Sequence, residues 1–263
     1  MSDAYLEQVE ELKEDVRRML TANANESSKK LRLTDLLQQL GVAYHFEREI
    51  EEALKQIHDS PNGFDEIDLN TMALQFHLLR QQGYNVPCDA FNRLKDSKGS
   101  FRWELIKDVS GMLCLYEASY MKVHGEDILD ESHVFTTTQL KSLVNELKPP
   151  LATQVMHALK QPLHKGMPRL KARQYISVYQ QIEMRNETLL KLAKLDFNLL
   201  QSIHQRELCQ LSSWNISASD QLPEYMKVLY FALLNVYREV EEDLREEGKS
   251  YRVYYAIEEV RHP

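Results

Sequence analysis

Hydrophobic residues recur every three or four positions along most of this chain. Near the N-terminus, Leu6, Val9, Leu12, Val16 and Leu20 follow this spacing, with polar residues between them. An α-helix has 3.6 residues per turn, so these five side chains share one helical face. The same spacing returns after each interruption, which predicts a chain built from amphipathic helices.

The interruptions consist of turn-forming residues. They are the segments 21–30, 59–68, 95–100 and 161–170, together with the Pro149–Pro150 pair. Proline and glycine interrupt helices, so each segment predicts a loop. The segment 161–170, QPLHKGMPRL, contains two prolines and a glycine, and it is the predicted linker between two domains.

The pattern also predicts where individual helices begin and end. We expect Thr34 to cap the second helix, and we expect another helix to start after Asp68 and stop at Gly83. The stretch 101–123 is apolar on a wide face, which predicts a helix deep in the core. No β-hairpin pattern and no repeat of fixed length occurs. The predicted fold class is therefore all-α.

The linker divides the predicted fold into a helical domain, residues 1–160, and a second helical region, residues 161–263. In the second region, long helices are predicted over 187–212 and from Pro223 to Glu247. We expect these two helices to pack on each other and on the first domain. Gly248 suits the C-terminal cap of the last long helix.

Composition and charge exclude several classes of protein. Hydrophobic residues make up 43% of the 263 residues, enough for a substantial core, and the formal net charge is −8. A nucleic-acid-binding face needs clustered Lys and Arg, whereas here the basic residues alternate with acids. No apolar run approaches the roughly 20 residues that a membrane span needs. We therefore expect neither a nucleic-acid partner nor a membrane span.

The cysteines and the N-terminus indicate the compartment. The chain has three cysteines, an odd number, and no C-x-x-C spacing, which favours a reducing environment. The first 20 residues are acidic and already periodic, unlike a signal or transit peptide. A cytoplasmic location is the expectation.

Motifs for nucleophilic, nucleotide and zinc chemistry do not occur in the sequence. It contains no G-x-S-x-G, G-x-G-x-x-G, P-loop or H-E-x-x-H string. Cys88, Cys114 and Cys209 lie in helical apolar patterns, so structural thiols are the favoured interpretation. His204 and Glu207 share a helix face near Cys209, but a His among Gln and Arg is typical of a surface position.

Two further groups of residues have the right spacing for chemistry. Acids at helical spacing are Glu239, Glu242, Asp243 and Glu246, and aromatic residues on the same predicted helix are Tyr225, Tyr230, Phe231 and Tyr237. Neighbouring carboxylates can hold Mg²⁺, and an aromatic wall can stabilise a cation. A solvated acidic face and a helix core have the same spacings, and we favour these interpretations. The acids at 65–68 and 127–131 precede helices, where they serve as caps.

Several longer strings resemble the plant terpene synthase family in the family's order, over about residues 4–259. They include LRLTDLLQQLGVAYHFEREIEEAL, DVSGMLCLYEASYMKVHGEDILDES, HALKQPLHKGMPRLKARQYI, LLKLAKLDFNLLQSIHQRELCQLSSW and LPEYMKVLYFALLNVYREVEEDL. The sequence is most similar to the cytosolic sesquiterpene synthases. The resemblance implies that residues 1–160 form a helical barrel-like domain and that 161–263 form part of the metal-binding bundle.

The resemblance also implies a chemistry. Such enzymes are lyases of isoprenoid biosynthesis that ionise farnesyl diphosphate with Mg²⁺ and cyclise the cation in an aromatic-lined pocket. A D-D-x-x-D helix and a second acidic motif hold the metal, and an R-x-R pair helps to bind the diphosphate.

The chain departs from this family pattern at its catalytic centre. Trp214 runs directly into Asn215, where the family has the R-x-R segment and the D-D-x-x-D helix, so an internal deletion is predicted. No D-D-x-x-D string occurs, and the sequence starts after the family's tandem arginines and stops at Pro263, before the second acidic motif. We therefore assign no catalytic, cofactor-binding or metal residue, and we expect no Mg²⁺ ligands.

Two hypotheses follow. In the first, the chain acts on farnesyl diphosphate with Mg²⁺ to give a sesquiterpene, as the family does, although the missing motifs predict an inactive, truncated chain. In the second, it is a non-catalytic helical protein or splice product with at most an interaction role. Apolar helix faces left without their family partners are expected to favour self-association.

Overall fold

The computed structural model describes residues 3–22, 27–60, 68–212 and 222–246. Within these ranges the chain is helical and has no strand, apart from one isolated antiparallel bridge between Lys95 and Phe101. The all-α prediction is confirmed. The α-helices are α1 Asp3–Ala22, α2 Ser27–Gln39, α3 Glu47–His58, α4 Leu69–Gln81, α5 Val109–Ser119, α6 Asp127–Leu143, α7 Leu151–Lys160, α8 Pro168–Tyr179, α9 Glu187–Ser212 and α10 Glu224–Glu246.

Short 3₁₀ helices complete the list of elements. They are η1 Ala43–His45, η2 Cys88–Leu94, η3 Trp103–Lys107 and η4 Leu163–Lys165. The predicted loop over 161–170 thus contains one helical turn and the start of α8. Its Pro168 is the first residue of α8, a position where the missing proline N–H costs nothing.

Helix starts are fixed by side-chain caps that the sequence partly reveals. The Asp68 carboxylate accepts a hydrogen bond from the Thr71 amide at 3.0 Å, and α4 begins directly after Asp68, at Leu69. At the other end of α4, Gly83 adopts φ +90°, a backbone conformation that favours glycine. Both predicted ends of this helix are therefore confirmed.

Two other predicted starts are wrong. Thr34 does not cap a helix, because α2 already begins at Ser27 and Thr34 is completely buried in its middle. The stretch 101–123 is not one helix, since the Asp108 carboxylate accepts a hydrogen bond from the Gly111 amide at 2.8 Å and so starts α5. The preceding residues form η3 instead. The predicted burial is confirmed for α5, where Met112 and Leu115 are fully enclosed.

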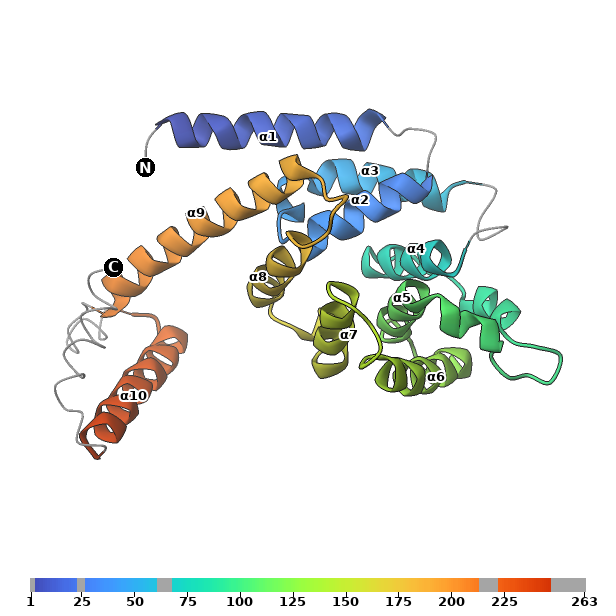
Figure 1. Cartoon of the computed structure of the whole chain (residues 1–263). Coiled ribbons are helices and arrows are strands. Elements are labelled where there is room, and N and C mark those ends of the chain that lie inside the picture. The colour runs from blue at the N-terminus through green and yellow to red at the C-terminus, as the bar shows by residue number, and fades with distance from the viewer. Residues whose placement is uncertain (1–2, 23–26, 61–67, 213–221, 247–263) are drawn as a thin grey trace. The chain divides into compact units, whose positions relative to one another are not determined.

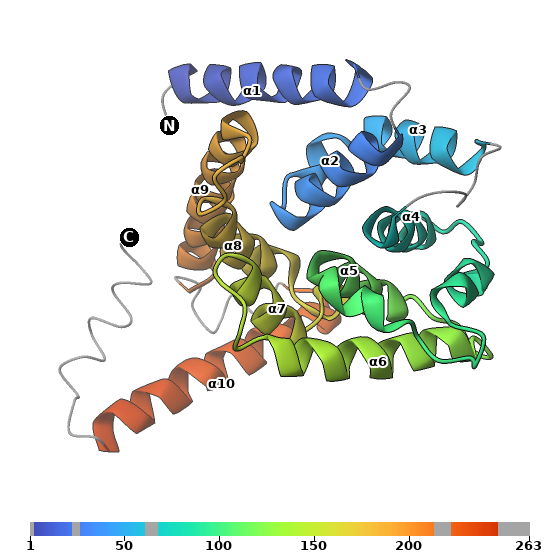
Figure 2. The same cartoon turned by 45° about the vertical axis from the view of Figure 1, so that its right-hand side comes forward.

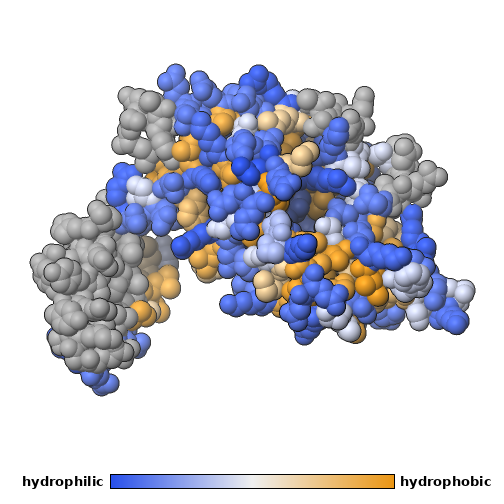
Figure 3. Space-filling model, viewed as in Figure 1, coloured by the Kyte–Doolittle hydropathy of each residue, from blue (hydrophilic) through white to orange (hydrophobic). Residues whose placement is uncertain are grey.

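Residues 1–197 form one compact unit, in which α5 packs between α4 and α6. Both views of the fold show these three helices side by side, with α7 and α8 following in the chain (Figure 1, Figure 2). Figure 3 shows a largely hydrophilic surface with hydrophobic residues gathered over α5, α6 and α7. Val134 of α6 and Met156 of α7 are both more than half exposed.

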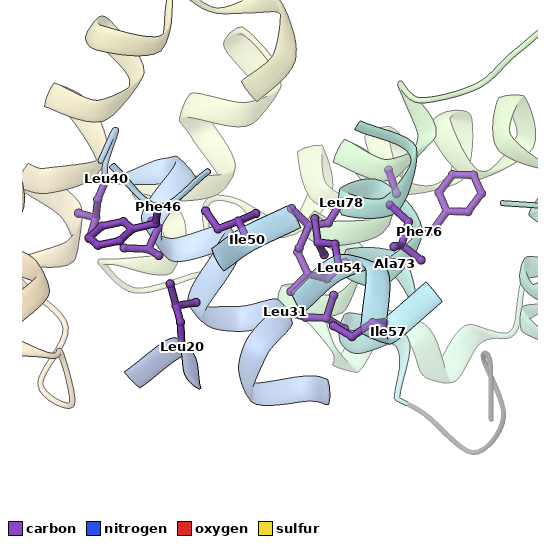
Figure 4. Packing of buried hydrophobic residues seen from close by; sticks show 14 of the residues in the cluster. Leu20, Leu31, Leu40, Phe46, Ile50, Leu54, Ile57, Ala73, Phe76 and Leu78 are labelled. Carbon is purple, nitrogen blue, oxygen red and sulfur yellow. The ribbon is translucent and has the colours of Figure 1, made fainter. Parts of the chain in front are cut away.

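The main core of this unit joins α1, α2, α3, α4 and the start of α9. Figure 4 shows Leu31 of α2, Leu54 of α3 and Leu78 of α4 among the side chains that meet there. Leu189 and Leu192, in the first turns of α9, belong to the same core. A second cluster joins α5, α6 and α7 and consists of Met112, Tyr116, Leu140, Val155 and Ala158. The predicted packing of helix 187–212 on the first domain is thus observed at its N-terminal end.

Residues 198–263 form the second unit, of which α10 is the main described element. This helix has the predicted position, within one residue at each end. It exposes Tyr225, Val228 and Leu229, each by more than 70%. The predicted Gly248 cap and the expected last helix near residue 260 lie outside the described residues. The packing of α9 against α10 and the domain boundary near residue 160 stay predictions.

No helix in the described ranges is both long enough and apolar enough to cross a lipid bilayer.

Candidate functional site

The described cysteines have the environment of structural thiols. Cys88 at the start of η2 and Cys114 in α5 are free and partly buried. Burial raises the pKa of both thiols, so neither is a thiolate at neutral pH. The side chain of Cys209 lies outside the residues whose side chains are described.

The candidate metal ligands do not form a metal site where they can be placed. No group of three or more His, Cys, Asp or Glu side chains in the described part of the chain could hold a metal ion. Glu239, Glu242 and Glu246 of α10 are exposed, in keeping with a solvated acidic face. The side chains of Glu207 and Asp243 are not among those described.

The aromatic residues of α10 do not share one environment. Tyr225 is 73% exposed, whereas Tyr230 is buried, and the Tyr230 and Phe231 rings meet edge to face at 6.2 Å. Tyr237 is outside the described side chains. Among the acids expected at helix starts, Asp68 caps α4. Asp127 does not cap α6 but lies in its first turn, where a negative charge suits the helix dipole.

A buried polar cluster holds the start of α9 within the first unit. Asp196 is 1% exposed and accepts hydrogen bonds from the Tyr44 hydroxyl, from His45 Nε2 at 2.8 Å and from Arg169 Nη1 at 3.3 Å. Burial alone would raise the pKa of Asp196, but the hydrogen bonds from His45 and Tyr44 hold it below its usual value. Arg169 also lies over the Phe197 ring.

A second buried ion pair joins α4 to the loop before α6. The Arg80 guanidinium binds both carboxylate oxygens of Glu126, Nη1 to Oε2 at 2.5 Å, and lies 4.2 Å above the Phe76 ring. Its Nε also donates to the Val86 carbonyl oxygen at 2.9 Å. The hydrogen bonds from Arg80 lower the pKa of Glu126 to about 2. The Asp196–Arg169 pair and the Glu126–Arg80 pair each join separate elements of the first unit, and both have structural roles.

The described residues of the first unit also line a partly open cavity of about 200 Å³, whose wall is both polar and apolar. Its walls come from α2, α4, α5, α7 and α8, and it contains the carboxylates of Asp35 and Glu117. The sequence alone does not reveal this site, because the two acids lie 82 positions apart in the numbering. The one local indication was a single acid within an otherwise apolar helical stretch, as in MLCLYEASYM.

Solved structures define the class of fold. Isoprene synthase from grey poplar (Populus x canescens) matches 97% of this chain with a TM-score of 0.75 and 31% identity, over 62% of its own length. A limonene synthase matches 98% of the chain with a TM-score of 0.69 and 25% identity, again over 62% of its length. The fold is therefore the all-α fold of these synthases.

The sequence comparisons give the family. The model for the terpene synthase N-terminal domain matches residues 1–159, and the model for the terpene synthase metal-binding domain matches residues 202–262. The chain belongs to the terpene synthase family. Curated relatives include (-)-germacrene D synthase from Vitis vinifera, 45% identical over 99% of the chain, and a valerianol synthase from Camellia hiemalis, 40% identical over 97%.

The chain spans about 60% of the length of these relatives. The alignment with the Vitis vinifera synthase extends over 334 positions, whereas the chain has 263 residues. At least 71 positions of the relative therefore have no counterpart within the aligned stretch. A gap of this size agrees with the predicted internal deletion. Its place at Trp214–Asn215 stays a prediction, since these residues lie outside the described ranges.

The family's metal-binding domain and the isoprene synthase complex with three Mg²⁺ ions associate a divalent metal with the family. The residues described for this chain do not fit such a metal centre, because they bring no three potential ligands together.

Proposed function

We propose that this chain derives from a plant sesquiterpene synthase and that, as a 263-residue polypeptide, it does not cyclise farnesyl diphosphate. The named products of its relatives, germacrene D, valerianol and hedycaryol, support the sesquiterpene assignment. The gap of at least 71 positions within the alignment, together with the lack of any D-D-x-x-D string in the sequence, carries the second half of the proposal.

Departure of the diphosphate leaving group is the step that this chain is not equipped to accelerate. Diphosphate departs with several negative charges, and an active site accelerates this step only if fixed positive charge meets them. Among the described residues we find no cluster that could supply it through a metal, so we derive no ionisation step for this chain. A carbocation also needs a closed, dry pocket, and the missing positions would have to form part of its wall.

An incubation of purified protein with farnesyl diphosphate and Mg²⁺ tests this proposal. The Vitis vinifera germacrene D synthase, assayed in parallel, shows that substrate and metal are competent. We expect terpene products from the relative and only the no-enzyme background from this chain. A cyclic sesquiterpene above that background would overturn the proposal.

The exposed face of α10 favours a second candidate function, that of an interaction protein. Tyr225, Val228 and Leu229 expose more than 70% of their surface, which is unusual for large apolar side chains on one helix. Self-association through this face is the outcome we propose.

The cytoplasmic location is likewise our proposal, supported by the odd cysteine count and the lack of C-x-x-C spacing.

A further inference from the structure

The cavity in the first unit is large enough for a small organic molecule. Its volume is about 200 Å³, and an apolar cavity of about 150 Å³ is known to accommodate benzene. Apolar side chains, among them Leu74, Leu113 and Val178, line part of the wall. Amide, imidazole and carboxyl groups line the rest. The site can therefore receive both a hydrocarbon body and a polar group.

Glu117 presents an oxygen atom without a partner. This residue of α5 is 6% exposed, and its Oε2 accepts a hydrogen bond from the Leu163 amide at 3.0 Å. Its Oε1 is buried and has no hydrogen-bond partner. A buried carboxylate oxygen without a donor is costly, because it has lost its water and gained nothing in return.

A second carboxylate lies in the same cavity. Asp35 of α2 accepts a hydrogen bond at its Oδ2 from Gln39 Nε2 at 2.7 Å. Burial raises the pKa of Asp35 to about 6 and that of Glu117 to about 7, and the charge of Asp35 contributes to the shift of Glu117. The charge of Asp35 thus makes the ionisation of Glu117 less favourable.

The other titratable side chains of the wall offset only part of this negative charge. Lys171 of α8 is the cation of the lining, where its charge acts against the rise in the pKa of Glu117, and its amino group donates to the Gln161 carbonyl oxygen. Burial lowers the pKa of His77 in α4 to about 4 and lowers that of His157 in α7, so both are neutral at pH 7. Two further groups, Cys114 of α5 and Tyr175 of α8, are uncharged because burial raises their pKa values.

Above about pH 7, where Asp35 and Glu117 are both ionised, two carboxylates against one lysine leave one negative charge. The unpartnered Oε1 of Glu117 is the acceptor that a ligand can reach. We propose that the cavity bounded by α2, α4, α5, α7 and α8 binds a small primary ammonium ion with a hydrocarbon body. The ammonium group donates hydrogen bonds to Glu117 Oε1 and neutralises the excess charge near Asp35. The hydrocarbon body contacts the apolar part of the wall. This proposal does not depend on the proposed function.

Isothermal titration calorimetry with phenethylammonium chloride tests the proposal on the full chain, with 2-phenylethanol as the neutral probe of nearly equal shape. We expect saturable binding of the ammonium ion and binding of the alcohol that is weaker by about tenfold or more, the value of one charge-assisted hydrogen bond. Equal binding of both probes would show that the ammonium charge is not recognised, and no binding of either would show that the cavity does not accept such a molecule. Either result would overturn the proposal.

A variant assigns the binding to Glu117. Glu117→Gln keeps the shape and an acceptor for the Leu163 amide but removes the charge, so we expect it to fold and to lose about tenfold or more in affinity for the ammonium ion. Glu51→Gln changes an exposed carboxylate outside the cavity and should bind like the unchanged protein. An ammonium affinity that is the same in both variants would contradict the assignment.

The pH dependence of the unchanged protein provides a check that needs no variant. An ammonium ion requires ionised carboxylates, so its affinity should fall as the pH is lowered from about 8 to about 5.5, while Glu117 and then Asp35 take up protons. His77 stays neutral throughout this range. An affinity that is constant across the range would refute the role of the two acids.

Discussion

The Asp196 cluster gives a sharp prediction about how α9 is held in the first unit. Asp196 is almost fully enclosed and accepts hydrogen bonds from Tyr44, His45 and Arg169, residues that belong to η1 and α8. In Asp196→Asn the shape is kept, but the negative charge is lost and one acceptor oxygen becomes a donor. Arg169 then has no counter-charge, and the new amide N–H₂ group faces the hydrogen-bond donors of Tyr44 and His45 instead of accepting from them.

The magnitude follows from burial. Removing one partner of a buried ion pair costs roughly 3–5 kcal/mol. The Arg169 side chain is 30% exposed, so water screens part of its charge. We therefore expect a loss of roughly 2–4 kcal/mol in the free energy of unfolding. For a unit of this size, such a loss lowers the Tm by roughly 5–15 °C.

Thermal and urea unfolding followed by circular dichroism measure this loss, because the chain is helical. Glu52→Gln is the matched control, since Glu52 pairs with Arg48 on the exposed face of α3 and should matter by less than about 0.5 kcal/mol. If Asp196→Asn unfolds at the same urea concentration as the control, the cluster does not stabilise the unit and our reasoning about α9 is refuted.

Three further predictions concern other parts of the chain. Arg80→Ala should destabilise the protein by roughly 3–5 kcal/mol in urea unfolding, since it leaves Glu126 buried without a counter-charge. The folded-state pKa of Glu126 is depressed to about 2, so this residue contributes about 3 kcal/mol to the free energy of unfolding above the ordinary Glu pKa. This contribution is lost as the pH falls towards 2. In the Arg80→Ala variant, the free energy of unfolding should not show this loss on acidification. Gly41→Ala should lower the free energy of unfolding by roughly 2–4 kcal/mol. Gly41 has φ +75°, and a Cβ there would lie 2.6 Å from the Ala172 Cβ. An unchanged Tm would disprove this close approach. Leu229→Glu should reduce self-association, measured as the molar mass by light scattering after gel filtration, whereas Glu224→Gln on the same helix should not. Equal masses for both variants at every concentration would show that the exposed face of α10 does not mediate self-association.

The sequence predicted most helices correctly because their determinants are local. Helix α9 has the predicted ends at Glu187 and Ser212, and α4 begins after Asp68, whose carboxylate caps it. Thr34 misled the prediction because a threonine that caps and a threonine buried inside a helix look alike in sequence. The start of α5 was missed because Asp108 interrupts an apolar run that otherwise continues.

The cavity could not be predicted, since it arises from contacts between distant segments. Asp35 and Glu117 each appear in the sequence as a lone acid in a largely apolar stretch. Only the packing of α4 against both α2 and α5 brings them to one space. The unpartnered state of Glu117 Oε1 likewise depends on which donors the fold places nearby.

The central claim is that this chain cannot gather divalent cations around a diphosphate, and a thermal-shift titration with MgCl₂ and inorganic pyrophosphate tests it most directly. A ligand present at 100 times its Kd stabilises a fold by about 2.7 kcal/mol, a shift of several degrees that the Vitis vinifera germacrene D synthase should display in parallel. We predict that this chain shows no rise in Tm with both solutes beyond the effect of either alone at equal ionic strength. A rise that requires Mg²⁺ and pyrophosphate together would contradict the account.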